Sequence, residues 1–505
     1  MTTTREHTGP RGWLAARSDD QLLGLCLAGL IVAVGVFLVV PLAGDLVPMH
    51  RLPTNRDLHV EGKDQGWVPG FWLFGVGSFL AAIWLWRSGR RPSWGLLLGG
   101  AAVLHLLSLL VPPVHSEDVY AYSFYGAVQH DYGQNPYGAF PDQHPLHPWF
   151  PFWSWRDIGP VYGGPFLLLL RGVATLAGPS LLAWVLWMKV ILVAAELAGV
   201  WLLVRALRDK DPQDRGWPVL LIAWNPMVLL SIGMSAHVDA FLLTLVAGTV
   251  LAHRRGRYLL AFLLLAVCFT IKLYMGPLAG LYALWLAGRL PPSRRLLEIA
   301  RLGALGVLVT VLAYLPFASA GGDLVASVGD VGGHYSSGSA GNIVRRAVTV
   351  VLQLFGATQT GATQAGDAAG RWLALAAVAA WTGLWMWRAL TRGDRDPLPL
   401  MATWFLGYLL LTPWVFYWHE VPLLALVAVI PWGLTSLGAI VLGMTLMPAS
   451  APNRAFVGVA PSDARQLLNT GTAFLSRYGG TVAVLLIGWL AQRRARSRAE
   501  ATSRR

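Results

Sequence analysis

The amino-acid sequence predicts an all-α membrane protein, a polytopic bundle of transmembrane helices. Hydrophobic residues make up 55% of the 505-residue chain and charged residues only 13%, and the mean hydropathy is +0.52. Soluble domains carry about 25% charged residues. Stretches of roughly 20 apolar residues recur along the chain, which is the length that a helix needs to cross the hydrocarbon core of a bilayer. The composition therefore excludes an ordinary soluble protein.

These stretches predict about 14 transmembrane helices. Pro431-Trp432-Gly433 interrupts the last long stretch and divides it into two spans, because proline breaks a helix. The first stretch is longer than the apolar region of a signal peptide and lacks an Ala-x-Ala cleavage site, which indicates a retained anchor. The expected spans lie near residues 22–43, 68–86, 95–112, 181–204, 217–234, 238–252, 258–271, 274–288, 298–317, 371–390, 398–414, 420–432, 434–447 and 479–491.

The basic residues set the expected orientation. The formal net charge is +13, and most of the 39 Lys and Arg residues lie in the two tails and in short links on one side of the spans. By the positive-inside rule these links are cytoplasmic. Basic residues scattered in this way do not form the surface that binds nucleic acid, so no nucleic-acid partner is expected. We expect a cytoplasmic tail at 1–21, a single multi-pass domain in the cell membrane at 22–491 and a basic cytoplasmic tail at 492–505.

Two further apolar stretches, 163–178 and 343–357, would invert this orientation if they crossed the membrane. We interpret both as interfacial helices on the outer face, packed against the bundle. The outer face then carries four large segments, and the longest of them is the expected catalytic segment. These segments are 44–67, 113–180, 319–370 and 448–478.

Adjacent carboxylates, Glu117 and Asp118, follow the third span. An unpaired Asp at the membrane surface has a raised pKa and can serve as a general base near neutral pH. The same pattern also fits a solvated helix N-terminus, with Ser116 as its cap. His237 and Asp239 lie where the chain re-enters the bilayer, and an ionisable pair at that depth is a candidate functional site. A helix cap is the alternative interpretation of this pair too.

Three cations are candidates for binding a phosphate group. Lys272 lies between two apolar stretches, and Arg345 and Arg346 follow a Gly- and Ser-rich stretch on the same expected side. The planar guanidinium of Arg bonds two phosphate oxygens at once. Lys272 also fits a lysine that reaches toward lipid headgroups. Together the three would face the carboxylates, an arrangement that suits an anionic leaving group.

A cluster of aromatic and polar residues ends another span, with Trp414, Tyr417 and His419 near its centre. Sugar rings stack on aromatic side chains, while an interfacial aromatic belt is the alternative interpretation. Cys26 and Cys268 lie inside apolar stretches and predict no disulfide framework. The sequence has no spacing typical of metal ligands, so we expect neither a metal nor another cofactor.

Four stretches of the chain form an ordered set. They are Asp118–Tyr122 with Gln134–Tyr137, Tyr162-Gly163-Gly164-Pro165, Trp224-Asn225-Pro226 with Ala236–Asp239, and Pro413-Trp414 with Tyr417-Trp418. In this order they resemble the GT-C class of glycosyltransferases that use polyprenyl-phosphate sugars. More narrowly, they resemble the actinobacterial polyprenol-phosphomannose-dependent α-1,6-mannosyltransferases, which build the mannan of lipomannan and lipoarabinomannan. The resemblance extends from about residue 20 to 490, and Tyr162-Gly163-Gly164 departs from the expected Tyr-Gly-Pro.

The resemblance implies a GT-C fold and transfer of mannose, with inversion, from polyprenyl-phosphate mannose to a lipoglycan acceptor on the outer face. Asp118 is then the catalytic carboxylate, with Glu117 beside it. Lys272, Arg345 and Arg346 bind the donor phosphate. Membrane lipids are the remaining expected partners. Residues implied in sugar or acceptor binding are Tyr120, Tyr122, Asn135, Tyr162, His237, Asp239, Trp414, Tyr417 and His419.

Two alternatives stay open at this point. The same scaffold can use another polyprenyl-phosphate sugar, arabinose or glucose, because nothing in the sequence distinguishes sugar stereochemistry. A secondary transporter is the alternative from another class. Transporters place charges near the bilayer midplane between two related halves. Here the candidate residues cluster at one expected face and no internal repeat is present, which favours the enzyme.

Overall fold

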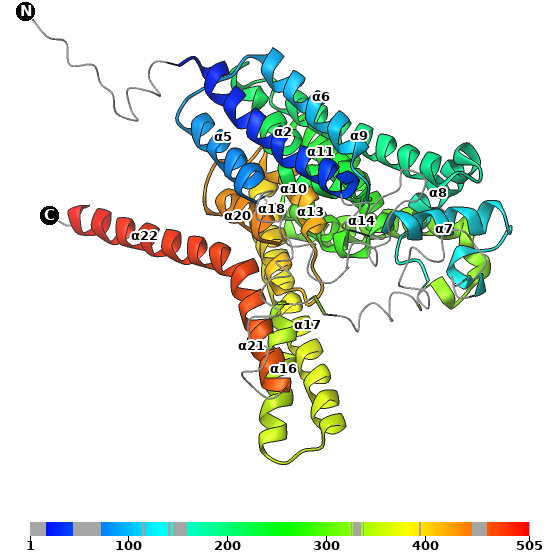
Figure 1. The fold of residues 1–505 in the computed structure, drawn as a ribbon. Coiled ribbons are helices and arrows are strands. Elements are labelled where there is room, and N and C mark those ends of the chain that lie inside the picture. Colours follow the sequence, from blue (N-terminus) through cyan, green and yellow to red (C-terminus); the bar gives the residue numbers. More distant parts are fainter. Residues whose placement is uncertain are drawn as a thin grey trace, which may run out of the picture.

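A computed structural model describes residues 17–43, 72–113, 116, 118–139, 143–144, 159–324, 326, 335–336, 338–392, 395–446 and 462–503. Within these ranges the chain is helical and contains no β-strand, which confirms the all-α prediction. Figure 1 shows most of the helices packed into one bundle. α16, α21 and the first part of α17 project from it together, and α22 extends away from it separately.

The helices of the bundle follow the apolar stretches closely. α12 covers the predicted span at 258–271 without a change of boundary. The bundle helices are α2 (Asp19–Ala43), α5 (Gly77–Arg87), α6 (Trp94–Leu110), α9 (Leu181–Ala206), α11 (Asp239–Arg254), α12 (Tyr258–Ile271), α13 (Gly276–Gly288), α14 (Pro292–Tyr314), α17 (Gln359–Thr391), α18 (Pro397–Leu411), α19 (Val421–Val427) and α20 (Leu434–Leu446). α22 (Gly480–Ser503) packs on α20 and extends away from the bundle.

The other helices include the two that were expected at an interface. These are α7 (Asp118–His130), α8 (Gly164–Ala177), α10 (Pro226–Val228), α16 (Ala340–Leu354) and α21 (Ser462–Phe474). Short π- or 3₁₀-helical turns named in the text are η2 (Pro136–Gly138), η6 (Val219–Ala223), η7 (Leu229–Met234), η8 (Leu273–Met275), η9 (Leu315–Ala320) and η10 (Tyr417–Glu420).

By length and composition, five of the described helices could cross a membrane, or six if one bent pair is a single span. Seven further apolar helices have 10–17 residues. The structure is therefore that of a polytopic helical membrane protein, while the number of about 14 spans stays a prediction. The five long segments are Asp19–Val36, Leu181–Ala206, Pro292–Ala320, Gln359–Thr391 and Leu467–Ala495.

The predicted span at 217–234 is bent. Its two halves, Asp214–Ala223 and Pro226–Met234, meet at an angle of 44°. Asn225 Oδ1 accepts the Met227 N–H at 2.9 Å and caps the second half, while Pro226 has no N–H with which to continue the first. The whole bend is buried, and protein contacts surround the irregular backbone there, as a membrane requires.

The expected span at 371–390 is the second part of a much longer helix. α17 starts at Gln359, because α16 packs along its polar N-terminal part. A Cβ atom at Gly366 would lie 2.5 Å from the Arg345 carbonyl oxygen, so this packing depends on a glycine. α21 packs on α16 and adds a helix to the predicted 448–478 loop. The three helices form the projecting limb of Figure 1.

Ion pairs hold the links at one end of the bundle. Arg90 Nη1 lies 3.0 Å from Asp19 Oδ1, and Arg91 Nη2 lies 2.8 Å from Asp214 Oδ1. These links are among those predicted to be cytoplasmic. The first residue of α11 and the last residue of α12 lie at the opposite helix ends. We call this opposite end the site end, because it carries the ionisable residues described next.

Candidate active site

Three separate segments bring charged side chains together at the site end. Asp118 is the first residue of α7, Asp239 is the first residue of α11, and Lys272 follows α12 directly. Ser116 Oγ accepts the Asp118 N–H at 3.2 Å and so starts α7 in the manner of a helix cap. The structure is thus compatible with both interpretations of this stretch, a helix cap and a functional site. The Ser116 cap fixes the start of α7 and so orients the Asp118 carboxylate. Glu117 lies outside the described residues.

The contacts of the Asp118 carboxylate all fall on one oxygen. Tyr162 Oη donates to Oδ2 at 3.0 Å, Tyr122 Oη lies 3.5 Å from it, and His237 Nδ1 lies 3.3 Å from it. Among the described residues none bonds Oδ1, and 28% of the side chain is exposed. One oxygen therefore anchors the carboxylate, while the other is open to an incoming group.

The surroundings of Asp118 lower the pKa of its carboxyl from 3.8 to about 2. Burial by itself would raise this pKa. The hydrogen-bonding contact and charge of His237, the charge of Lys272 and the Tyr162 hydroxyl outweigh burial, because all three favour the ionised form. The expectation of a raised pKa was wrong, since it assumed an unpaired carboxylate. Asp118 is an anion at neutral pH.

His237 lies completely buried beneath this carboxylate. Its ring stacks on Trp418 with the centroids 3.7 Å apart, and Trp418 stacks in turn on Phe416 at 4.5 Å. Neither ring nitrogen makes a well-aligned hydrogen bond with the described residues. The polar group that the ring does approach among them is the Asp118 carboxylate, 3.3 Å from Nδ1. The preceding residue, Ala236, has φ +58°. Such backbone strain clusters at functional sites.

Asp239 and Lys272 form a buried ion pair. Lys272 Nζ lies 2.7 Å from Asp239 Oδ2, and Tyr274 Oη donates to Oδ1 at 2.9 Å. Both oxygens of Asp239 thus have partners. Lys272 Nζ also lies 5.8 Å from the ring centroids of Tyr162 and Tyr274, which is within cation–π range. Asp239 therefore holds the ammonium group beside the ring whose hydroxyl binds Asp118.

Two glycines explain how Tyr162 reaches this position. A Cβ atom at Gly163 would lie 1.4 Å from the Thr270 carbonyl oxygen, and one at Gly164 would lie 2.0 Å from the Ala313 carbonyl oxygen. Gly163 N also donates to the Ile271 carbonyl at 3.1 Å. The Tyr-Gly-Gly sequence thus lets the backbone lie directly on the ends of α12 and α14, next to Lys272.

His419 joins the same cluster from η10. Its Nδ1 accepts the Phe416 N–H at 3.2 Å, and its ring packs against Tyr274 with the centroids 5.1 Å apart. Burial lowers the pKa of His419 well below 6.5, and the charges of Lys272 and His237 lower it further. The imidazole is therefore neutral with its proton on Nε2. Tyr417 packs edge-on against His237 at 6.2 Å, and Trp414 against Phe416 at 5.5 Å.

Other predicted site residues have structural partners. Asn135 Nδ2 donates to the Phe317 carbonyl at 3.0 Å and to Ser319 Oγ at 2.9 Å, which fastens η2 to η9. Tyr137 Oη donates to the Tyr162 carbonyl at 2.8 Å. Tyr120 is buried on α7. The loop that contains Asn135 thus supports Tyr162 from behind.

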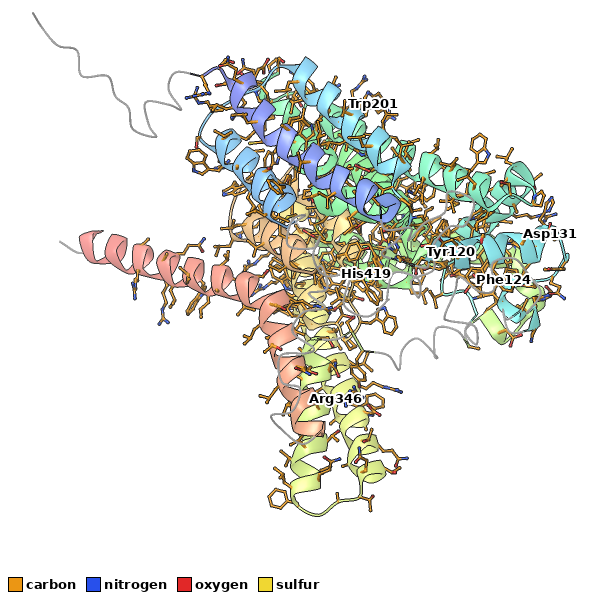
Figure 2. All side chains as sticks on the ribbon, in the orientation of Figure 1. Tyr120, Phe124, Asp131, Trp201, Arg346 and His419 are labelled. Carbon is orange, nitrogen blue, oxygen red and sulfur yellow. The ribbon has the colours of Figure 1, made fainter. Side chains whose placement is uncertain are left out.

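The structure does not bring Arg345 and Arg346 to the carboxylates. Arg345 Nη1 lies 3.2 Å from Asp367 Oδ1, between α16 and α17. Figure 2 shows Arg346 on the projecting limb, well separated from His419 and Tyr120. In the described residues, Lys272 is the cation that contacts the carboxylate cluster, and no group of three or more His, Cys, Asp or Glu side chains could hold a metal ion.

Sequence reasoning missed the roles of two aromatic residues, Trp418 and Tyr274. Trp418 is the stacking partner of His237, and Tyr274 bonds Asp239 and packs on His419. Both lie within one or two residues of a predicted site residue. That proximity was a usable signal. The chain contains 24 Trp and 14 Tyr, however, and nothing else in the sequence distinguishes these two from the other aromatic residues.

The fold and the site together define a class: a polytopic helical membrane protein with a carboxylate, lysine and histidine cluster at the ends of its helices. Residues 21–288 match the family model described as "Alpha-(1->6)-mannopyranosyltransferase, N-terminal domain". The chain therefore belongs to this mannosyltransferase family, which confirms the predicted resemblance. The matched region contains Asp118, His237, Asp239 and Lys272, whereas His419 lies beyond it.

A curated relative supports the same family. Over 159 residues the chain is 29% identical to an alpha-(1->6)-mannopyranosyltransferase of Mycobacterium tuberculosis. The match covers 30% of this chain and 26% of the relative. The chain thus spans about a quarter of the length of the curated relative that it matches.

Proposed function

We propose that this protein is an inverting membrane glycosyltransferase of GT-C type. It transfers mannose from polyprenyl-phosphate mannose to a mannan or lipoglycan acceptor and forms α-1,6 linkages on the outer face of the cell membrane. Membership of the mannosyltransferase family supports the sugar and the linkage. The observation that carries the proposal is the meeting of Asp118, His237 and Lys272 at the site end, from three segments far apart in the sequence.

Asp118 is the general base of this proposal. The acceptor hydroxyl approaches Oδ1, the oxygen that the described residues leave open, while Tyr162 and His237 hold Oδ2. The hydroxyl oxygen forms a bond to the anomeric carbon as the bond from that carbon to the phosphate oxygen breaks. Its proton passes to Asp118 and the electron pair leaves with the phosphate. Attack opposite a β-linked phosphate gives an α-linked product.

A carboxylate with a pKa of about 2 is a weak base, and this suits the reaction. Glycosyl transfer passes through a transition state with oxocarbenium character. The attacking hydroxyl becomes strongly acidic only as its bond to the anomeric carbon forms, so a weak base suffices at that late stage. Until then the fixed negative charge of Asp118 stabilises the developing positive charge on the sugar.

Lys272 is the residue we assign to the donor phosphate. Its ammonium group is held by Asp239 Oδ2 at 2.7 Å and lies 5.8 Å from the centroid of the Tyr162 ring. A preorganised cation stabilises the charge that a departing phosphate gains. His419 offers a neutral Nε2–H beside it, because Nδ1 is occupied by the backbone N–H of Phe416. Arg345 and Arg346 stay candidates for the same role.

The lipid part of the donor fits an apolar face beside the site. α14 ends at Tyr314, next to the Ala313 carbonyl on which Gly164 packs. Its outward side chains include Val307, Leu308, Val311 and Leu312, which are 51–63% exposed. A prenyl chain along this face would lead its phosphate toward Tyr162 and Lys272. The arginine-rich links at the opposite helix ends support an extracytoplasmic site by the positive-inside rule.

The test compares Asp118→Asn with the wild-type protein in membranes supplied with radiolabelled polyprenyl-phosphate mannose. Asp118→Asn should lose at least about 100-fold in turnover, the usual scale for a general base, while donor binding is retained. Asp131→Asn is the matched control, because Asp131 follows the same helix and contacts His130 on the surface. If Asp118→Asn keeps near wild-type turnover, Asp118 is not the general base.

Parallel assays with polyprenyl-phosphate arabinose and glucose test the sugar. Mannose should be the only one of the three that gives a product, and linkage analysis should find α-1,6 bonds. A product from arabinose or glucose but not mannose would overturn the donor assignment. Asp131→Cys, labelled with a membrane-impermeant reagent in intact cells, tests whether the site faces the outside of the cell. Absence of labelling would contradict an outer site.

A further inference from the structure

A buried lysine of α9 holds the carbonyl end of α6. Lys189 is 1% exposed. Its Nζ donates to the carbonyl oxygens of Ser108 and Leu109 at 3.4 Å each, and also to that of Val111. α9 is one of the long apolar helices, so this ammonium group lies within a segment that could span the membrane. Ionisable residues at such depth are costly and usually functional.

The chemistry of a helix end explains why the lysine is there. The last four carbonyl groups of an α-helix lack partners within the helix. They carry partial negative charge, and a cation near them is favourable. After α6 the chain continues with Pro112 and Pro113, which have no N–H to offer. The Val111 N–H donates to the Ser108 carbonyl at 3.3 Å, and Lys189 supplies the donors that the two prolines lack.

The segment that follows α6 carries Asp118, and α9 holds this segment at its other end too. Trp184 Nε1 donates to the Val119 carbonyl at 3.3 Å. A Cβ atom at Gly126 would lie 2.7 Å from the Trp184 ring, so α7 rests directly on this side chain. Lys189 and Trp184 therefore fix the backbone on both sides of Asp118 from one helix.

The segment that carries His237, the residue that contacts Asp118, packs against the same end of α6. A Cβ atom at Gly233 would lie 2.0 Å from Ser108 Oγ, so η7 packs closely against the residue whose carbonyl Lys189 binds. η7 leads directly into the strained turn at Ala236 and then to His237. The end of α6 thus sits between the two chain segments whose side chains meet at the Asp118 carboxylate.

We propose that Lys189 is a positioning residue, whose ammonium group sets the place of Asp118 by fixing the carbonyl end of α6. The inference rests on the proposed function, because it concerns the base of that reaction. Lys189 touches neither Asp118 nor His237 in the described structure and acts only through the backbone. Removal of the ammonium group lets the end of α6 and the start of α7 shift, while the donor site around Lys272 stays intact.

A second buried polar pair in the same interface provides a matched control. His105 Nε2 lies 3.1 Å from both carboxylate oxygens of Glu196, again between α6 and α9. Glu196 is seven residues further along α9 from the site end and completely buried. It resembles Lys189 in burial and in the two helices it joins, but it does not contact the end of α6.

The experiment measures donor kinetics of full-length Lys189→Met, Lys189→Arg and Glu196→Gln in membranes. Displacement of a reacting group by about 1 Å costs on the order of 100-fold in rate. Lys189→Met should therefore lose about 10- to 100-fold in kcat with the donor KM within about threefold of wild type. Lys189→Arg should recover most of kcat, and Glu196→Gln should stay within about threefold.

Hydrogen exchange of peptides that cover residues 111–122 gives a second readout that needs no activity. Exchange should be faster in Lys189→Met than in wild type, and unchanged in Glu196→Gln. Equal kcat or equal exchange in Lys189→Met, or an equal kcat loss in Glu196→Gln, would overturn the proposal. If the wild-type protein transfers no mannose, the proposed function fails, while the exchange comparison still decides whether Lys189 holds the end of α6.

Discussion

The hydroxyl of Tyr162 donates a hydrogen bond of 3.0 Å to Oδ2 of Asp118, across 44 residues of sequence. This bond orients the carboxylate and favours its ionised form. The Tyr162 ring meanwhile lies 5.8 Å from Lys272 Nζ. One side chain thus connects the proposed base with the proposed phosphate-binding cation, and its removal should affect both.

Tyr162→Phe should lower turnover by roughly 10-fold, the scale of one lost hydrogen bond to a charged group, about 1.5 kcal/mol. The pKa of Asp118 should rise, because a bond to its ionised form is lost. Tyr122→Phe is the control, since Tyr122 Oη lies 3.5 Å from the same oxygen and should matter less. Steady-state kinetics of both variants provide the measurement, and equal effects would contradict the ranking.

The pH dependence follows from the low pKa of Asp118, about 2. Asp118 stays ionised from about pH 5 to 8, so its titration should leave kcat/KM unchanged across that range. The neutral form of His419 is favoured, because burial and the charges of Lys272 and His237 lower its pKa well below 6.5. A pH–rate profile checks this, and an acid limb near pH 6 that disappears in Asp118→Asn would contradict it.

Stability should respond to acid through the same group. A carboxyl whose pKa is lower in the folded protein stabilises the fold above its unfolded pKa, here 3.8. That contribution decreases as the pH falls through 3.8 toward about 2. Thermal unfolding in detergent at several pH values should show a smaller acid-induced loss for Asp118→Asn than for the wild type. Parallel losses would indicate that other groups dominate.

Lys272→Ala should weaken donor use and stability together. It leaves the buried Asp239 carboxylate without its cation, a change that costs about 3–5 kcal/mol in buried pairs. The double variant Lys272→Ala/Asp239→Ala should regain stability but not activity, which separates the two effects. Arg346→Ala tests the other phosphate candidate under the same conditions. A higher donor KM for Arg346→Ala than for Lys272→Ala would reverse the assignment.

Gly163→Ala should disturb the site by sterics alone. Its new methyl group would collide with the Thr270 carbonyl oxygen, a backbone atom that cannot rotate away. Overpacking of this kind costs about 1–3 kcal/mol, and Tyr162 would move away from Asp118. Gly172→Ala, on α8 with no atom within 4 Å of its Cβ, is the control and should be nearly neutral. Thermal unfolding and turnover provide the comparison.

Sequence alone predicted most of the apolar helices, because apolar segments in lipid must satisfy their backbone groups within the helix. It also singled out Asp118, His237 and Lys272, since ionisable residues at the ends of apolar stretches are conspicuous, and the structure brings these three together. It missed the first part of α17, residues 359–370. This stretch has no apolar periodicity, and it packs with α16 through a glycine at 366.

The tertiary structure alone decided which charges pair. Asp239 pairs with Lys272, which lies 33 residues further along the chain. Asp118 contacts Tyr162 and His237, so its pKa is lowered instead of raised. Arg345 is instead paired with Asp367 on the projecting limb. A helix can be predicted from local sequence because its hydrogen bonds are local. An ion pair between distant segments depends on how those helices pack, and no local pattern encodes that.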